Sequence, residues 1–147
     1  MKQTGISIIK KLQEAGFEAV FAGGCVRDML MGVVPKDYDI ATSATPDEVE
    51  ALFERTIPIG KSFGVVRVLE NLQEFEVATF RKDSKSSDGR RPSSVEFSSM
   101  EQDAQRRDFT INGLFFDPVS DCIFDFVGGL KDIQDKIIRF IGNPSEK

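Results

Sequence analysis

The sequence predicts one α/β domain in which a small mixed, partly antiparallel sheet is flanked by helices. Amphipathic helical segments alternate with short apolar runs along the chain, as expected when helices cover a sheet. At least one pair of those runs is joined by a tight polar turn, which makes part of the sheet antiparallel. The 147 residues, 40% of them hydrophobic, suffice for one ordinary core and are too few for two comfortable domains.

The first third of the chain predicts helix, strand, glycine turn and helix in that order. Residues 4–16 carry apolar side chains at helical spacing and end at Gly16, which suits the left-handed position after a last turn. The apolar run over residues 17–22 predicts a strand that stops at Gly23-Gly24. Residues 25–32 then have helical character and close on a further glycine.

The middle of the chain predicts a strand, a well-capped helix and a hairpin. Residues 37–41 alternate as a strand would, and Thr45-Pro46-Asp47-Glu48 is a capping box with proline at the first helical position. The segment Gly64-VVRVLE and the segment FEVATF are separated by a polar turn over residues 71–74, which predicts an antiparallel pair.

The last third is expected to contain a long loop, two helices and a strand. Residues 82–95 have almost no large apolar side chains and predict a mobile loop, because they bury too little surface to offset chain entropy. Helical character is expected over residues 101–116 and 130–136, with a short strand over 123–126 between them.

Composition excludes several classes of chemistry. The chain has no histidine, which removes Ser-His-Asp and Cys-His catalysis. Its two cysteines, Cys25 and Cys122, lack metal-site spacing and are expected to be buried thiols in a reducing compartment.

No apolar run approaches a membrane span and the N-terminus does not read as a signal peptide, so we expect a cytoplasmic protein without membrane contact. The net charge of −5 opposes stand-alone nucleic-acid binding.

The segment Gly23-Gly24-Cys25-Val26-Arg27 lies between a predicted strand and a predicted helix. Two glycines allow close backbone approach, a helix start presents free N–H groups, and Arg27 adds a forked cation, which together suit a triphosphate. The alternative is a tight turn with a surface charge pair between Arg27 and Asp28.

Three carboxylates are candidates for a metal site. Asp37 and Asp39 are two apart, so on a strand they face the same way and suit Mg²⁺, which prefers hard oxygen ligands. Glu76 would complete a two-metal site if its strand neighbours theirs. The alternatives are a solvated strand end for the aspartates and an exposed edge-strand residue for Glu76.

The segment Arg106-Arg107-Asp108-Phe109-Thr110-Ile111-Asn112 places two arginines near an expected helical start. Helical spacing puts Asp108 and Asn112 on one face, with Arg107 directed elsewhere and available to phosphate. The alternative is a solvated arginine-rich turn.

The motifs GGCVRDMLMG, KDYDIAT, FEVATFR and RRDFTINGL, in this order, resemble the family of class II tRNA nucleotidyltransferases and bacterial poly(A) polymerases, within the polymerase β superfamily. The match spans roughly residues 20–140. It implies a nucleotidyltransferase head with a five-stranded mixed sheet.

The resemblance also implies roles for the site residues. Asp37 and Asp39 would ligate two Mg²⁺ ions, with Glu76 as the third carboxylate. Gly23, Gly24, Arg27 and Arg107 would bind the phosphates of ATP or CTP. Residues 82–95 fall where the family has a mobile loop.

The neck motif E-D-x-x-R-x-x-R of this family is missing from the chain, which we therefore interpret as a head domain over residues 1–147, a fragment without neck, body and tail. The expected function is template-independent addition of C and/or A to the tRNA 3′ end, including enzymes that add only CC or only A. Poly(A) polymerase is the close alternative. A small-molecule nucleotidyltransferase and a non-catalytic nucleotide-binding module are more distant ones.

Overall fold

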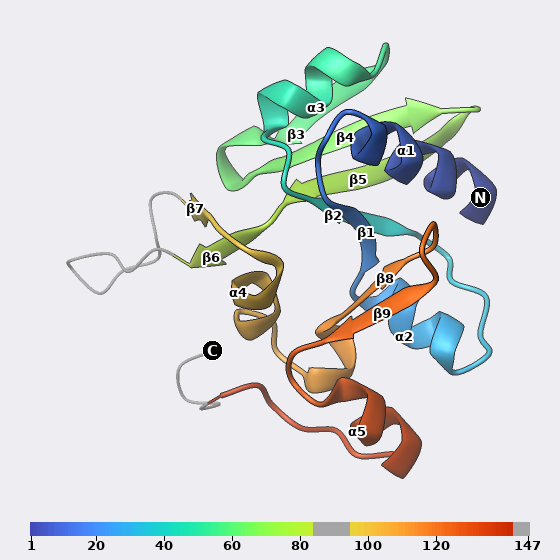
Figure 1. Ribbon diagram of the computed structural model, residues 1–147, viewed down its shortest axis with the longest axis vertical. Coiled ribbons are helices and arrows are strands. Elements are labelled where there is room, and N and C mark those ends of the chain that lie inside the picture. The colour runs from blue at the N-terminus through green and yellow to red at the C-terminus, as the bar shows by residue number, and fades with distance from the viewer. Residues whose placement is uncertain (84–94, 143–147) are drawn as a thin grey trace.

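The computed structural model describes residues 1–83 and 95–142 (Figure 1). The predicted loop over residues 82–95 therefore falls largely outside the described residues. Its two ends were predicted wrongly, because Arg81–Asp83 (β6) and Val95–Phe97 (β7) pair as antiparallel strands. Among the described residues, no helix combines the length and apolar character needed to cross a bilayer.

The main sheet has the strand order β3-β4-β5-β2-β1-β8-β9, in which only β2 and β5 pair in parallel. This confirms the mixed α/β fold class, while the expected five strands become seven. The strands are Ala19–Ala22 (β1), Asp39–Thr42 (β2), Thr56–Gly60 (β3), Val65–Glu70 (β4), Gln73–Thr79 (β5), Leu114–Asp117 (β8) and Cys122–Asp125 (β9).

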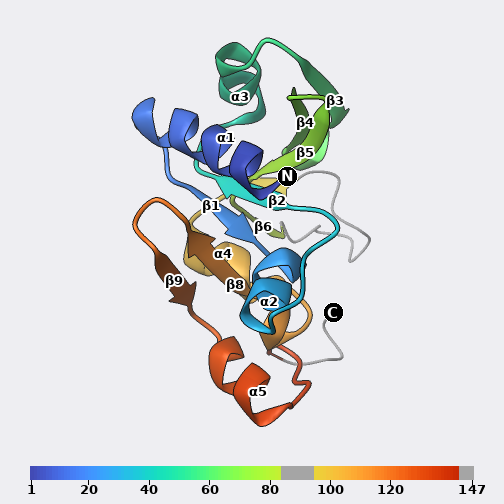
Figure 2. The same cartoon turned by 90° about the vertical axis from the view of Figure 1, so that its right-hand side faces the viewer.

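Helices pack on both faces of this sheet (Figures 1 and 2). The α-helices are Lys2–Glu14 (α1), Gly24–Leu30 (α2), Pro46–Leu52 (α3), Met100–Gln105 (α4) and Gly129–Asp135 (α5), with short 3₁₀ turns at Lys61–Phe63 and Thr110–Asn112.

Strand β1 lies at the centre of the core because both of its faces are buried. Phe21 belongs to a cluster with the apolar stripe of α1 and with Val49 of α3. Val20 and Ala22 belong to a second cluster, with Met100 and Ala104 of α4. Burial on both faces explains why the β1 sequence is a continuous apolar run rather than an alternating one.

The local signals near the N-terminus and in the middle of the chain are confirmed. Gly16 has a φ of 97°, and the Thr45 capping box forms with both of its hydrogen bonds. The β4–β5 hairpin forms as predicted, but its turn is tighter than residues 71–74 and centres on Asn71 and Leu72, both with positive φ. Cys25 is buried as expected, whereas Cys122 is exposed, contrary to the prediction.

The helix expected over residues 101–116 is wrong beyond Gln105. The chain instead passes through the 3₁₀ turn at Thr110–Asn112 and enters β8, which pairs with β1 on one side and with β9 on the other. Leu114 and Phe115 are fully buried, in different clusters on the two faces of the sheet. This burial outweighs the helical pattern of the sequence, which carries no information on the pairing partner.

Candidate functional site

The turn between β1 and α2 brings backbone close to an arginine that is distant in sequence. Gly23 has a φ of 75°, and a Cβ atom at this position would lie 3.1 Å from Nη1 of Arg107. Both the conformation and the space therefore favour glycine at Gly23. The predicted strand–turn–helix placement of Gly23 and Gly24 is confirmed.

Arg27 lies in α2 with its guanidinium held on two sides. Its Nε and Nη2 donate to Oδ1 of Asp28 at 3.1 and 3.0 Å, and its Nη1 donates to Oδ1 of Asn112 at 2.8 Å. The charge pair with Asp28 therefore forms, and it coexists with a position beside the glycine turn. Three of the five guanidinium N–H directions are used, so donors remain.

Arg107 follows α4 and is held at one edge only. Its Nε and Nη2 donate to Oδ1 of Asp103 at 3.2 and 3.0 Å, and its guanidinium carbon lies 5.3 Å from the Phe115 ring centroid. Within the described residues Nη1 donates to no protein atom, and it is the nitrogen nearest to Gly23. This edge is available to an anion.

These groups line one open cavity of about 480 Å³. It brings together the four residues predicted to bind phosphate, although three of them lie within residues 23–27 and the fourth is Arg107. Its lining residues are Gly23, Gly24, Arg27, Asp39, Arg106, Arg107, Asp108 and Asn112.

The three candidate carboxylates line a neighbouring cavity of about 370 Å³. Asp39 is the first residue of β2, and the parallel register Ile40↔Val77 places it level with Glu76 of β5. Asp37 precedes the strand, so the expectation that it lies on β2 was wrong, but it faces the same cavity. Asp39 also lines the first cavity, which makes it the residue common to both.

The electrostatics show that the carboxylates act on one another. Partial removal of water raises the pKa of Asp39, the charges of Glu76 and Asp37 raise it further, and only Arg107 opposes them. Glu76 also pairs with Arg67 across the hairpin at 3.6 Å, and Arg67 reaches Glu74 at 3.5 Å.

Asp37, Asp39 and Glu76 fit a divalent cation by their chemistry. They are hard oxygen donors whose mutual repulsion a cation relieves. Among the described residues, however, no three acidic, cysteine or histidine side chains lie close enough to form a ready metal-binding group. The fit is that of a site with few protein ligands, which suits Mg²⁺ because this ion retains waters and binds substrate phosphates.

Several neighbours of the site escaped sequence reasoning. Asp103 precedes Arg107 by one helical turn, a spacing that signals an ion pair, and Arg67 faces Glu76 in the hairpin register. The predicted partnership of Asp108 and Asn112 is weak, with 3.5 Å between their side chains, because Asn112 mainly accepts from Arg27.

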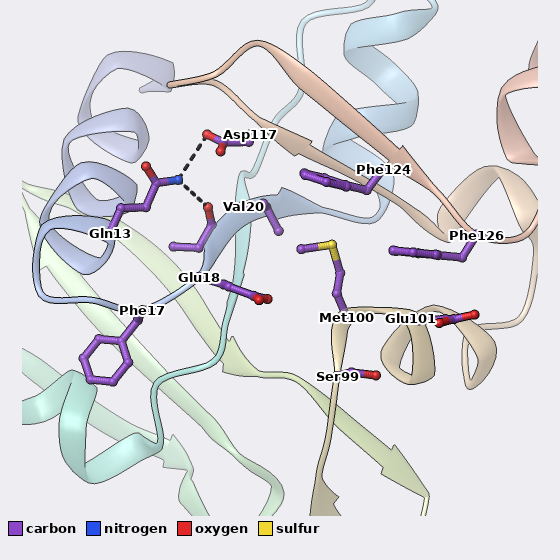
Figure 3. Close-up of a pocket in the computed structure, with 11 residues that line it drawn as sticks. Gln13, Phe17, Glu18, Val20, Ser99, Met100, Glu101, Asp117, Phe124 and Phe126 are labelled. Atoms are coloured by element: carbon purple, nitrogen blue, oxygen red, sulfur yellow. Dashed lines mark hydrogen bonds between the residues drawn. The ribbon is translucent and has the colours of Figure 1, made fainter.

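A separate cavity of about 550 Å³ lies between α1, α4 and β9 (Figure 3). Phe124 and Met100 supply apolar surface, and Gln13 is fixed by hydrogen bonds to Asp117 and to the Ala19 carbonyl at 3.1 and 3.0 Å. None of the predicted site residues lines it, so we assign it no part in the chemistry.

Known proteins resemble the chain over nearly its whole length. The CCA-adding enzyme of Staphylococcus epidermidis is 45% identical over 141 residues, which cover 95% of this chain and 35% of the relative. Poly(A) polymerase I of Salmonella typhi is 39% identical over 158 residues, covering 100% of this chain and 34% of the relative. The chain thus spans about a third of the length of these curated relatives.

The fold is shared with a solved structure as well. The crystal structure of the Bacillus stearothermophilus CCA-adding enzyme in complex with CTP matches with a TM-score of 0.85 and 41% identity, covering 95% of this chain and 33% of that one. The family model described as the Poly A polymerase head domain matches residues 19–139. The chain therefore belongs to the poly(A) polymerase head-domain family of nucleotidyltransferases.

Proposed function

We propose that this chain is the catalytic head of a template-independent RNA nucleotidyltransferase that adds C and/or A to the 3′ end of tRNA in the cytoplasm. The observation that carries the proposal is the junction of two cavities at Asp39. An arginine- and glycine-lined cavity suited to a triphosphate opens beside a cavity lined by Asp37, Asp39 and Glu76.

The arginines hold the nucleotide by its phosphates. Arg27 and Arg107 are each anchored by a neighbouring carboxylate and keep unused N–H donors. Guanidinium groups pair with phosphate through two parallel hydrogen bonds, and anchoring reduces the entropy lost on binding. Gly23 leaves room for Arg107 and for close approach of the nucleotide to the backbone.

The carboxylates serve the reacting end of the triphosphate. Asp37 and Asp39 would hold two Mg²⁺ ions with Glu76 as the third carboxylate. Bound there, divalent ions supply neutralisation of the charge on the α-phosphate and on the attacking oxygen. The pairing of Glu76 with Arg67 keeps that carboxylate at the cavity wall.

The reaction follows from this placement. The oxygen of the RNA 3′-hydroxyl loses its proton to solvent and forms a bond to the α-phosphorus, the bond from that phosphorus to the bridging oxygen breaks, and pyrophosphate leaves. Arg27 and Arg107 stabilise the charge that accumulates on the leaving pyrophosphate. Electrostatic placement of this kind supplies most of the catalysis in phosphoryl transfer.

Base selection and tRNA binding are assigned to regions beyond the head. The chain covers about a third of its relatives, and its net charge of −5 opposes binding of a polyanion such as tRNA. Accordingly, we expect the chain alone to add nucleotides poorly. Poly(A) addition is the second candidate, because Poly(A) polymerase I is 39% identical over the whole chain.

The test is calorimetric titration of the chain with CTP and with ATP, with and without Mg²⁺. We expect both nucleotides to bind in a Mg²⁺-dependent manner, and the Asp37→Ala/Asp39→Ala variant to lose that binding. Glu14→Ala/Glu54→Ala is the matched control, because it removes two exposed carboxylates outside the site and should bind like the unaltered chain.

The same titration separates the alternatives. Equal affinity for both bases supports a head that reads the triphosphate while other regions choose the base. Binding that is indifferent to Mg²⁺ and to the aspartates would point to a non-catalytic nucleotide-binding module and would overturn the proposal.

A further inference from the structure

Asp103 is a buried carboxylate that the proposed chemistry leaves unused. Its side chain is 1% exposed. Aspartate is rarely buried unless it is paired, so the partners of this carboxylate indicate its role. It lies in α4 one helical turn before Arg107, on the side of the sheet opposite α1 and α3.

The partners of Asp103 come from two different elements. Oδ1 accepts from Nε and Nη2 of Arg107 at 3.2 and 3.0 Å, whereas Oδ2 accepts from the backbone N–H of Arg81 at 2.9 Å. Arg106 makes a longer contact, 3.4 Å from Nη2 to Oδ2. The carboxylate therefore links the phosphate-facing arginine to the first residue of β6.

The geometry at Arg107 is that of a clamped side chain. Asp103 occupies the Nε–Nη2 edge, the Phe115 ring covers one face, and Nη1 is left towards Gly23 and the cavity. A free arginine side chain has many rotamers, and fixing it before the ligand arrives lowers the entropy lost on binding.

The charges favour the same conclusion. Two guanidinium groups, those of Arg106 and Arg107, share the one carboxylate of Asp103, so the cluster keeps an excess positive charge next to the cavity. Asp103 pairs with the Nε and Nη2 side of Arg107 and leaves Nη1 without a protein acceptor among the described residues. This is the arrangement expected if the arginine also binds an anion.

We propose that Asp103 is a positioning residue for the nucleotide. It holds Arg107 with Nη1 directed at the phosphates, and it fixes the position of that arginine relative to β6 through the hydrogen bond from the Arg81 backbone. This inference rests on the proposed triphosphate site. It assigns Asp103 a role in ligand affinity, which a purely structural link between α4 and β6 would not have.

The test is a double-mutant cycle measured by calorimetry with Mg²⁺ and CTP on the unaltered chain, Asp103→Asn, Arg107→Met and the double variant. Asp103→Asn should weaken CTP binding about tenfold, because a charged hydrogen-bonded clamp becomes a neutral one. In the Arg107→Met background the same change should alter affinity less than about twofold, since the arginine it positions is gone.

Asp132→Asn is the matched control. Asp132 is also a buried carboxylate, 7% exposed, and is paired with Arg139 and Thr110. Both Asp132→Asn and Asp103→Asn should lower the melting temperature, because each removes a buried charged partner, but Asp132→Asn should leave CTP affinity unchanged.

A second measurement does not depend on the folding of the variants. In the unaltered chain, the Nε–H proton of Arg107 should exchange slowly with water by NMR, unlike that of the exposed Arg55, and addition of tripolyphosphate with Mg²⁺ should shift its Nη1 protons. Exchange as fast as that of Arg55 would overturn the clamp.

The outcomes separate the two proposals. If the unaltered chain does not bind Mg²⁺·CTP, the proposed function fails and this role fails with it. If the chain binds and Asp103→Asn binds equally well, or if the loss adds fully to that of Arg107→Met, only the positioning role of Asp103 fails.

Discussion

Gly23 joins a backbone constraint to the chemistry of the site. Its φ of 75° strains any side chain, and a Cβ atom there would press on Nη1 of Arg107 at 3.1 Å. Gly23→Ala should therefore lower the free energy of unfolding by about 1 kcal/mol and also weaken Mg²⁺·CTP binding. Thermal unfolding and calorimetry measure the two effects separately.

Gly16 supplies the control for that substitution. Its φ is 97°, but nothing lies within 4 Å of a Cβ atom at this position. Gly16→Ala should lower stability to a similar extent and leave nucleotide affinity unchanged. An equal loss of affinity in both variants would show that Gly23 acts through stability alone.

The two cysteines differ in environment and should differ in reactivity. Burial raises the pKa of Cys25 to about 11, whereas Cys122 is exposed. Thiolate is the reactive form, so at pH 8 only about one Cys25 side chain in a thousand is ready to react. Iodoacetamide should label one cysteine per folded chain, and Cys122→Ser should remain unlabelled until denaturant is added.

Site residues that belong to a recognisable motif could be predicted from the sequence. Residues whose role depends on a contact between distant segments could not. Gly23, Asp39 and Arg107 gather as the ordered motifs indicate. The hydrogen bond from the Arg81 backbone to Asp103 joins residues 22 positions apart in sequence, and no local pattern predicts it.

Among the elements, those formed by local interactions follow the sequence most closely. The capping box of α3 and the β4–β5 hairpin depend on residues close in the chain, and both form. Strand β8 depends on its pairing with β1, nearly a hundred positions earlier, so the helical spacing before it was misleading. Pairing partners of that kind are absent from local periodicity.

The β4–β5 turn contains a correctable strain. Asn71 and Leu72 have φ values of 51° and 61°, as a two-residue type I′ turn requires, and Asn-Gly is the preferred pair for it. Leu72 is 99% exposed, so its side chain contributes no packing. Leu72→Gly should raise the free energy of unfolding by about 0.5–1 kcal/mol, measured by denaturant unfolding.

Leu72→Ala tests whether the backbone is the cause of that gain. Alanine removes the exposed side chain but keeps the Cβ atom, so it should give little or no stabilisation. A gain equal to that of glycine would instead implicate exposure of the leucine side chain.

At the scale of the whole molecule, strand pairing in the sheet places the acidic cavity next to the arginine-lined cavity, with Asp39 between them. The parallel pairing of β2 with β5 aligns Asp39 with Glu76, and the pairing of β1 with β2 sets Asp39 beside the glycine turn. The chain as a whole carries net negative charge, whereas the cavity beside the glycine turn is lined by three arginines. In this arrangement Glu76 and Asp37 repel the carboxylate of Asp39, and Arg107 opposes them.

That repulsion makes Asp39 unfavourable to the fold when no cation is present. Desolvation, Glu76 and Asp37 raise its pKa above the ordinary value of 3.8, so folding favours the protonated form. The associated stability is present below that value and is lost as the pH rises through the higher pKa of the folded chain. The penalty is therefore larger at neutral pH than in acid.

Asp39→Asn should therefore raise the melting temperature of the chain in EDTA at pH 7, and the gain should shrink as the pH is lowered towards 4. Mg²⁺ with CTP should stabilise the unaltered chain and not the variant, because binding to the folded state adds stability only where the site is intact. Differential scanning calorimetry of both chains, in EDTA and with Mg²⁺·CTP, measures the melting temperatures that this comparison needs. A variant that is less stable in EDTA would show that Asp39 serves the fold and that its repulsion is relieved within the protein.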